Sequence, residues 1–274
     1  MKRIELVKSQ LKSVSSNLIK VSNAVLDDKS IKLVTLDSPP MNVIGKALLT
    51  KLTETLLKLN EDDETRVIIL TGNSKVFAAG ADVKHFSQKT YSEMIKEDYT
   101  NLYEDIYYKL TKPIIAAING IAYGGGFELA LCCDIIVASD KAKIGFPELK
   151  LGLFPGAGGT QRLAKLAGYN KAAEYVLTAS DINVNELKQV GVVNHVVPSD
   201  KVIECAVDIA KNIGRFSMLS VNQAKKALRL SLETNLYAGL KAEKNLFHAL
   251  FNSEDKKIGI DAFLNKKEAK FIDK

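Results

Sequence analysis

Short apolar runs and amphipathic segments alternate along most of this chain. We expect strands in four apolar, β-branched stretches, at 31–37, 66–72, 113–120 and 133–140. The last three are nearly continuous apolar runs, which is typical of strands buried on both faces of a sheet. Helical patterns lie between the strands, at 46–60 and 91–111 and directly after three consecutive glycines. This alternation predicts an α/β fold with largely buried sheets.

The pattern changes near residue 213. Strand signals stop there, and helical patterns follow at 220–233 and 240–251. No low-complexity linker separates the two regions. We therefore expect three parts: an N-terminal extension, an α/β core and a helical C-terminal subdomain, at 1–23, 24–212 and 213–274.

Composition narrows the class of protein. With 46% hydrophobic and 26% charged residues, the 274-residue chain resembles an ordinary globular protein, and no apolar run reaches the length of a membrane span. The net charge of +6 suits an anionic ligand, whereas no platform of aromatic and Arg residues supports nucleic-acid binding. The three cysteines, with Cys132 and Cys133 adjacent, fit neither a disulfide framework nor a metal site. They predict a reducing compartment, and we expect the cytoplasm.

The N-terminus allows a second compartment. Residues 1–20 contain one acid, Glu5, against five basic residues, and their apolar positions follow a helical period. This composition resembles a mitochondrial transit peptide, although Arg is scarce and no clear cleavage signal follows. A solvated extension and a targeting segment leading to the mitochondrial matrix both remain open. No secretory signal is present.

Four segments contain more glycine, or fewer residues suited to core packing, than a buried core requires. They lie at 76–84, 122–130, 145–152 and 153–162. A glycine-rich turn between a strand and a helix leaves free N–H groups, which suit a phosphate or a developing oxyanion. The phosphate-loop, dinucleotide-binding and serine-hydrolase patterns GxxxxGK[ST], GxGxxG and GxSxG are absent.

Two acids lie within these segments. Glu128 follows the three glycines and Glu148 follows Pro147, in surroundings that are otherwise apolar or glycine-rich. Two carboxylates in one pocket can divide acid and base roles when their environments separate their pKa values. Alternatively, Glu128 is an acid in the first turn of a helix and Glu148 a turn acid. Spacing alone leaves both interpretations open.

Three motifs resemble those of the enoyl-CoA hydratase, or crotonase, superfamily: FAAGADVK, INGIAYGGGFELALCCDI and FPELKLGLFPGAGGTQR, at 77–84, 118–135 and 146–162. The resemblance covers residues 24–274. It implies a crotonase-like fold, a spiral of ββα units in the core with a helical C-terminal oligomerisation subdomain. It also implies a homo-oligomer, either a trimer or a dimer of trimers.

The resemblance implies reversible syn-addition of water to 2-trans-enoyl-CoA, giving 3-hydroxyacyl-CoA, in fatty-acid β-oxidation or related acyl-CoA metabolism. The amides of Ala81 and Gly125 match the family's oxyanion hole, and Glu128 and Glu148 match its base and acid. Gly156 matches a supporting backbone position. The acyl-CoA thioester is the expected partner. Coenzyme A is part of that substrate, and no metal or other cofactor is expected.

The resemblance also implies contacts to coenzyme A. They fall on a segment around the first oxyanion amide and on two C-terminal residues that reach a neighbouring subunit's site. The matching positions are Ala79, Ala81, Asp82, Val83, Lys84, Phe263 and Lys266.

Some positions depart from the family pattern or leave alternatives open. Phe146 stands where many hydratases carry Gln, and Phe127 is bulky, which leaves the acyl specificity open. The stripe Tyr99, Tyr103 and Tyr107 fits either packing or the wall of an acyl pocket.

Two same-fold alternatives are an enoyl-CoA isomerase and a methylglutaconyl-CoA-type hydratase. A non-catalytic CoA- or RNA-binding protein is a third. The presence of both acids favours hydration.

Overall fold

The computed structural model describes residues 18–25 and 28–274. Most of the predicted extension therefore lies outside the described residues. Its last residues belong to the first strand, which pairs antiparallel with the second, Ile19 opposite Leu36. Within the described residues the strands are β1 Ile19–Val25, β2 Asp28–Leu36, β3 Val67–Thr71, β4 Val76–Ala78, β5 Ile114–Ile118, β6 Ile121–Tyr123, β7 Ile135–Ser139, β8 Lys143–Gly145, β9 Asp181–Ile182 and β10 His195–Val197.

The strands form two sheets. The six-stranded sheet has the order β1-β2-β3-β5-β7-β10, and the four-stranded sheet has the order β4-β6-β8-β9. Consecutive pairs β3/β4, β5/β6 and β7/β8 each give one strand to each sheet, and β2, β3, β5, β7 and β10 run parallel. The chain therefore winds between the two sheets as a spiral of strand pairs and helices, which confirms the implied ββα fold.

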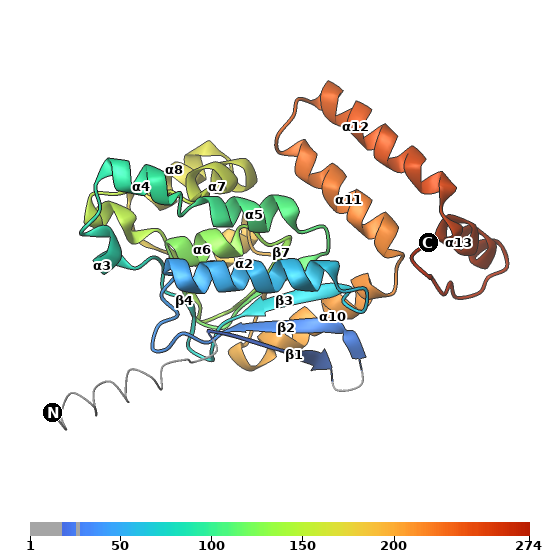
Figure 1. Ribbon diagram of the computed structural model, residues 1–274, viewed down its shortest axis with the longest axis horizontal. Helices are drawn as coiled ribbons and strands as arrows, with labels where there is room; N and C mark the ends of the chain where they lie inside the picture. The colour runs from blue at the N-terminus through green and yellow to red at the C-terminus, as the bar shows by residue number, and fades with distance from the viewer. Residues whose placement is uncertain (1–17, 26–27) are drawn as a thin grey trace.

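Helices cover both faces of the six-stranded sheet (Figure 1). The core helices are α2 Lys46–Glu61, α3 Val83–Phe86, α4 Tyr91–Glu97, α5 Asn101–Lys109, α6 Gly125–Ala130, α7 Gly159–Ala167, α8 Tyr169–Leu177, α9 Val184–Gln189 and α10 Val202–Gly214, with 3₁₀ turns η1 Pro147–Leu151 and η2 Ser199–Lys201. Ala206 and Ala210 of α10 pack on one face, against Ile69 and Ile115. Leu49 and Leu52 of α2 belong to the larger cluster on the other face.

The segment 91–111 is not one helix, as its pattern predicted, but two. The first helix, α4, ends at Asp98, whose φ of 44° places it in the left-handed conformation. Tyr99 and Thr100 join it to α5, which begins at Asn101. The break turns the chain between the two helices and leaves Tyr99 outside both.

The C-terminal residues form helices that extend away from the core (Figure 1). They are α11 Met218–Ser231, α12 Leu236–Ala249, η3 Leu250–Asn252 and α13 Glu254–Leu264. Lys225 of α11 and Asp255 of α13 are buried charged residues, whereas α12 buries none of its residues. No helix in the described part of the chain combines the length and apolarity needed to cross a membrane.

Candidate active site

The three consecutive glycines each contact a different part of the structure. Gly124 has a φ of 50°, and a Cβ added there would collide with the Glu148 carboxylate. A Cβ on Gly125 would lie 2.8 Å from the Tyr103 hydroxyl oxygen and 3.6 Å from the Ala81 nitrogen. A Cβ on Gly126 would collide with the Ala78 carbonyl oxygen. The glycines therefore bring α6 against β4, Ala81 and Glu148 at once.

The two amides predicted to form an oxyanion hole lie close together. Gly125 is the first residue of α6, where an amide has no intrahelical acceptor. Ala81 follows β4 and forms an isolated bridge with Ile44. Neither amide donates to an acceptor among the residues that the structure describes. Two free donors therefore lie on one small patch of backbone.

Glu128 is buried, and its carboxylate is held by backbone. Its Oε1 accepts hydrogen bonds from the Ala157 amide at 2.7 Å and the Gly159 amide at 2.8 Å. Burial raises the pKa of the Glu128 carboxyl, and the two amides and the Arg162 guanidinium oppose the rise. Arg162 also donates to the Ala157 carbonyl oxygen at 2.9 Å, which ties the first turn of α7 to this loop.

Glu148 lies in η1, half-buried, with its carboxylate against Gly124. Its pKa is raised to about 7, mainly by burial and to a smaller extent by the nearby Glu128, against a backbone hydrogen bond that lowers it. Its Oε2 is buried and has no partner within the described parts of the chain. The two carboxylates lie close enough for Glu128 to raise the pKa of Glu148. Their environments differ, because two amides from the loop before α7 hold Glu128 Oε1, whereas Glu148 Oε2 has no partner among the described residues.

The loop before α7 contributes differently from the sequence expectation. Gly156 is exposed, and a Cβ there would meet only the Phe154 carbonyl oxygen, at 3.8 Å. The amides that contact Glu128 belong to Ala157 and Gly159, which sequence reasoning missed. The run of glycines before a helix was the available signal, since it marks free amides. It did not indicate which amides turn inward.

The segment predicted to contact coenzyme A begins at the site. Ala79 and Ala81 flank Gly80, and the Asp82 carboxylate caps α3 by accepting from the Lys84 amide at 3.0 Å. The Lys84 side chain is exposed. Phe263 and Lys266 lie at the end of α13, and Figure 1 shows α13 at the opposite end of the molecule from α3. The protomer therefore does not bring these two residues to the acids.

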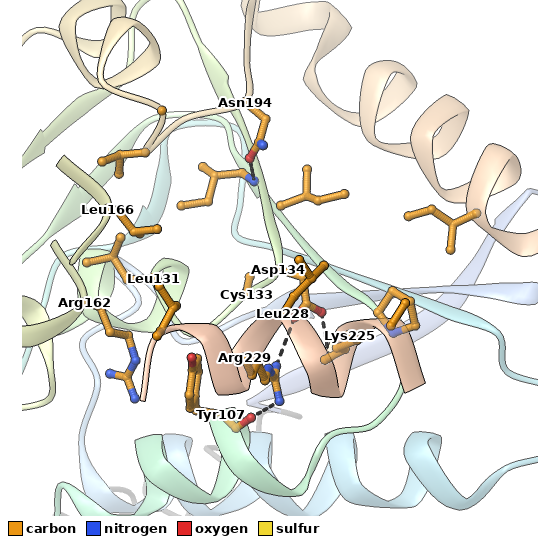
Figure 2. Close-up of a pocket in the computed structure, with 18 of the residues that line it drawn as sticks. Tyr107, Leu131, Cys133, Asp134, Arg162, Leu166, Asn194, Lys225, Leu228 and Arg229 are labelled. Carbon is orange, nitrogen blue, oxygen red and sulfur yellow. Dashed lines mark hydrogen bonds and ion pairs between the residues drawn. The ribbon is translucent and has the colours of Figure 1, made fainter. Parts of the chain in front are cut away.

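A cavity of about 530 Å³ lies elsewhere, between α11 and the core (Figure 2). Its walls are mostly apolar and include Leu131, Leu166 and Leu228, together with Arg162 and Arg229. None of the predicted site residues lines it. The cavity therefore does not contain the two acids. The candidate site is defined by the two carboxylates and the two free amides instead.

Phe127 and Phe146 pack against each other behind the acids, with ring centroids 5.1 Å apart. Both are buried. A Cβ on Gly159 would lie 2.8 Å from the Phe146 ring and 3.0 Å from Glu128 Oε1. The Phe146 ring therefore lies against the loop that holds Glu128.

Known proteins resemble this chain over most of its length. The family model for enoyl-CoA hydratase/isomerase matches residues 27–274. A probable mitochondrial enoyl-CoA hydratase of Dictyostelium discoideum is 41% identical over 86% of both chains. The 2,3-dehydroadipyl-CoA hydratase of Escherichia coli is 40% identical over 88% of this chain and 94% of its own. The crystal structure of an enoyl-CoA hydratase from Bacillus anthracis superposes with a TM-score of 0.86 at 34% identity, covering 94% of this chain and all of that one. This chain belongs to the enoyl-CoA hydratase/isomerase family.

Proposed function

We propose that this chain is an enoyl-CoA hydratase, which adds water reversibly to the double bond of a 2-trans-enoyl-CoA. The observation that carries the proposal is the buried Glu128 carboxylate close to the half-buried Glu148, beside two amides that lack acceptors among the described residues. Relatives that are 40% and 41% identical over most of their length carry hydratase names, which supports the same reaction.

In this scheme the Ala81 and Gly125 amides bind the thioester oxygen of the substrate. Removing one such donor typically costs about 2.7–4 kcal/mol of transition-state stabilisation. Polarisation of the carbonyl makes C3 electrophilic. Ionised Glu128 takes a proton from water as the water oxygen bonds to C3, and protonated Glu148 gives its proton to C2. In dehydration the two roles exchange. The scheme adds the hydrogen and hydroxyl of one water molecule without a net change of oxidation level, so it needs no redox cofactor, and coenzyme A enters as part of the substrate.

The proposal is tested with purified protein and 2-trans-enoyl-CoA thioesters of increasing chain length. Hydration removes the conjugated double bond, so the near-ultraviolet absorbance of the thioester should fall. One thioester with a carboxylate at the far end of its acyl chain should be included, because one relative is a 2,3-dehydroadipyl-CoA hydratase. A protein that hydrates none of these thioesters would overturn the proposed function.

The pKa of Glu148 predicts how the rate depends on pH. Hydration needs ionised Glu128 and protonated Glu148, and dehydration needs the reverse, so both directions use the carboxylate pair with one proton. Because burial raises the pKa of Glu148 to about 7, this proton is lost above about pH 7. We expect kcat/KM to fall about tenfold per pH unit on the alkaline side. The profile should be the same in both directions. An alkaline limb present in only one direction would contradict the shared proton.

The contacts to coenzyme A remain part of the proposal. We propose that the substrate's coenzyme passes Ala79, Ala81, Val83 and Lys84, and the exposed Lys84 ammonium can pair with its phosphates. Asp82 already caps α3, so we assign it a backbone role.

We also propose that the chain forms a trimer or a dimer of trimers. The C-terminal helices support this proposal, because α12 exposes Leu236, Tyr237 and Phe247 and buries nothing within the protomer. Phe263, 82% exposed at the end of α13, and Lys266 would then reach the coenzyme of a neighbouring subunit. The molar mass from light scattering should be three or six times that of the chain.

The compartment is likewise proposed. Relatives include proteins named as mitochondrial and a bacterial enzyme, which fit different compartments. We propose the cytoplasm, with the mitochondrial matrix as the alternative if residues 1–20 are a transit peptide. The N-terminal sequence of the native protein separates the two, because an intact start excludes cleavage.

A further inference from the structure

Two tyrosine hydroxyls of one segment contact the backbone of the two proposed oxyanion donors. Tyr103, on α5, is 1% exposed, and its hydroxyl donates to the Gly125 carbonyl oxygen at 3.2 Å. The same hydroxyl oxygen lies 2.8 Å from the position of a Gly125 Cβ. Tyr103 therefore fixes the first residue of α6, whose amide is one donor.

Tyr99 contacts the other donor through one intervening segment. It is buried, and its hydroxyl donates to the Ile44 carbonyl oxygen. The Ile44 amide donates to the Gly80 carbonyl oxygen at 2.8 Å, and Ile44 forms a parallel bridge with Ala81. Ile44 is therefore the backbone neighbour of Ala81, and Tyr99 holds that neighbour in place.

The two tyrosines support each other. Their rings meet edge to face, with centroids 6.3 Å apart. Burial raises the pKa of both hydroxyls above the ordinary value, so both keep their protons and act as donors. Packing alone does not account for hydroxyls at these positions, since Phe would fill the same space. Tyr99, just before α5, and Tyr103, on α5, therefore each make a polar contact with the backbone beside one of the two proposed oxyanion donors.

We propose that Tyr99 and Tyr103 are positioning residues that fix the separation of the Ala81 and Gly125 amides. This inference rests on the proposed function, because it assigns these amides to the thioester oxygen. Donors of this kind stabilise the transition state only when they are held about 2.7–3.1 Å from the oxyanion. A misplacement of about 1 Å can cost about 100-fold in rate.

The test replaces each hydroxyl by hydrogen. Tyr99→Phe and Tyr103→Phe keep the rings, and Tyr107→Phe, on the same helix, is the matched control. Among the described residues, no hydrogen bond joins the Tyr107 hydroxyl to either donor segment. Hydration kinetics are measured with the enoyl-CoA that the parent protein hydrates fastest. We expect each of the first two variants to lower kcat about tenfold, with KM within about twofold of the parent value.

A spectroscopic probe separates positioning from simple packing. A cinnamoyl-CoA with a para-dimethylamino group absorbs at longer wavelength when its thioester carbonyl is polarised. The red shift on binding should be smaller for Tyr99→Phe and Tyr103→Phe than for the parent protein and Tyr107→Phe. A loss of packing would move the urea midpoint and leave this red shift unchanged. If Tyr103→Phe is too unstable to purify, Tyr99→Phe is tested by the same two measurements.

The outcomes separate the two proposals. Parental kcat and an unchanged red shift in both variants would overturn the positioning role and leave the hydratase assignment intact. A parent protein that neither hydrates an enoyl-CoA nor shifts the probe would overturn the proposed function, and the positioning role with it.

Discussion

Replacing Glu128 or Glu148 by Gln should lower kcat for hydration by about 10²–10⁴-fold, the usual contribution of a positioned acid or base. Gln keeps an oxygen that can accept from the Ala157 and Gly159 amides, so the loop around Glu128 should stay in place. The change removes the ability to take or give a proton, together with the negative charge of the ionised carboxylate. The measurement is steady-state hydration of the enoyl-CoA that the parent protein uses best, together with a urea unfolding curve for each variant.

The double variant tests whether the two carboxylates act as one unit. Groups that share one proton-transfer step are strongly non-additive, so the double variant should be little slower than the worse single variant. An exposed acid, Glu54 on α2, gives the control, and Glu54→Gln should keep the parental rate. If either Glu128→Gln or Glu148→Gln hydrates within about threefold of the parent rate, that acid has no catalytic role.

The same variants distinguish the hydratase from an isomerase of the family. Movement of a double bond from C3 to C2 needs a proton removed and returned, and one carboxylate can do both. Hydration needs a base for water and an acid for C2 at the same time. We therefore expect both variants to lose hydration, while any isomerisation of a 3-enoyl-CoA depends on only one of them. Isomerisation without hydration in the parent protein would favour the alternative.

The longest elements were predictable because their patterns are local. The helix expected at 46–60 is α2, Lys46–Glu61, and its buried leucines recur with a helical period. The four expected strands are β2, β3, β5 and β7. The three-residue strands β4, β6 and β8 carry too few positions to show alternation. The exchange of consecutive strands between two sheets is a tertiary arrangement, which the resemblance implied and periodicity did not.

The candidate site shows the same difference between local patterns, which the sequence reveals, and tertiary contacts, which it does not. Glu128 and Glu148 stood out because acids are unusual in apolar, glycine-rich sequence. The groups around them come from residues distant in the chain. The Gly159 amide is 31 positions from the carboxylate it contacts, and the Tyr99 hydroxyl is 55 positions from Ile44. No local pattern encodes such contacts. The tyrosine stripe was visible in the sequence, but its hydroxyl partners were not.

One polar cluster joins α11 to the core on the side of the 530 Å³ cavity (Figure 2). The Asp134 carboxylate lies 2.6 Å from the Lys225 ammonium and 3.1 Å from the Arg229 guanidinium, and it accepts from the Ile114 amide at 2.8 Å. The Lys225 side chain is only 7% exposed. Asp134 is therefore the anionic partner of two largely buried cations.

The Arg229 side chain has further partners. It donates to the Tyr107 and Leu110 carbonyl oxygens and stacks on the Tyr107 ring, whose centroid lies 4.6 Å from the guanidinium carbon. The Arg162 guanidinium lies at the same distance from that ring. The position of α11 thus depends on cations whose charge is balanced mainly by one carboxylate.

Asp134→Ala should lower the free energy of unfolding by about 3–5 kcal/mol, because it leaves buried cations without their partner. The two cations respond differently. Burial lowers the pKa of Lys225 to about 8, so this ammonium can lose its proton, whereas the Arg229 guanidinium stays charged at all pH values of interest. Asp134 raises the pKa of Lys225 in the parent protein, so in the folded variant this ammonium should lose its proton at lower pH, and the loss of stability should be smaller at pH 8 than at pH 6. Urea unfolding at fixed protein concentration, from pH 6 to pH 9, measures it.

The control for Asp134→Ala is an ion pair that remains in solvent. Glu54→Ala breaks an exposed pair on α2, 3.9 Å from Lys51, and should change the free energy of unfolding by less than about 1 kcal/mol. A double variant, Asp134→Ala with Lys225→Met, removes one of the stranded charges and should recover part of the loss. If Asp134→Ala costs no more than Glu54→Ala at pH 6, the cations are solvated and α11 is held by its apolar contacts alone. Because the remaining guanidinium cannot be neutralised, full recovery in the double variant would likewise contradict the role given to Arg229.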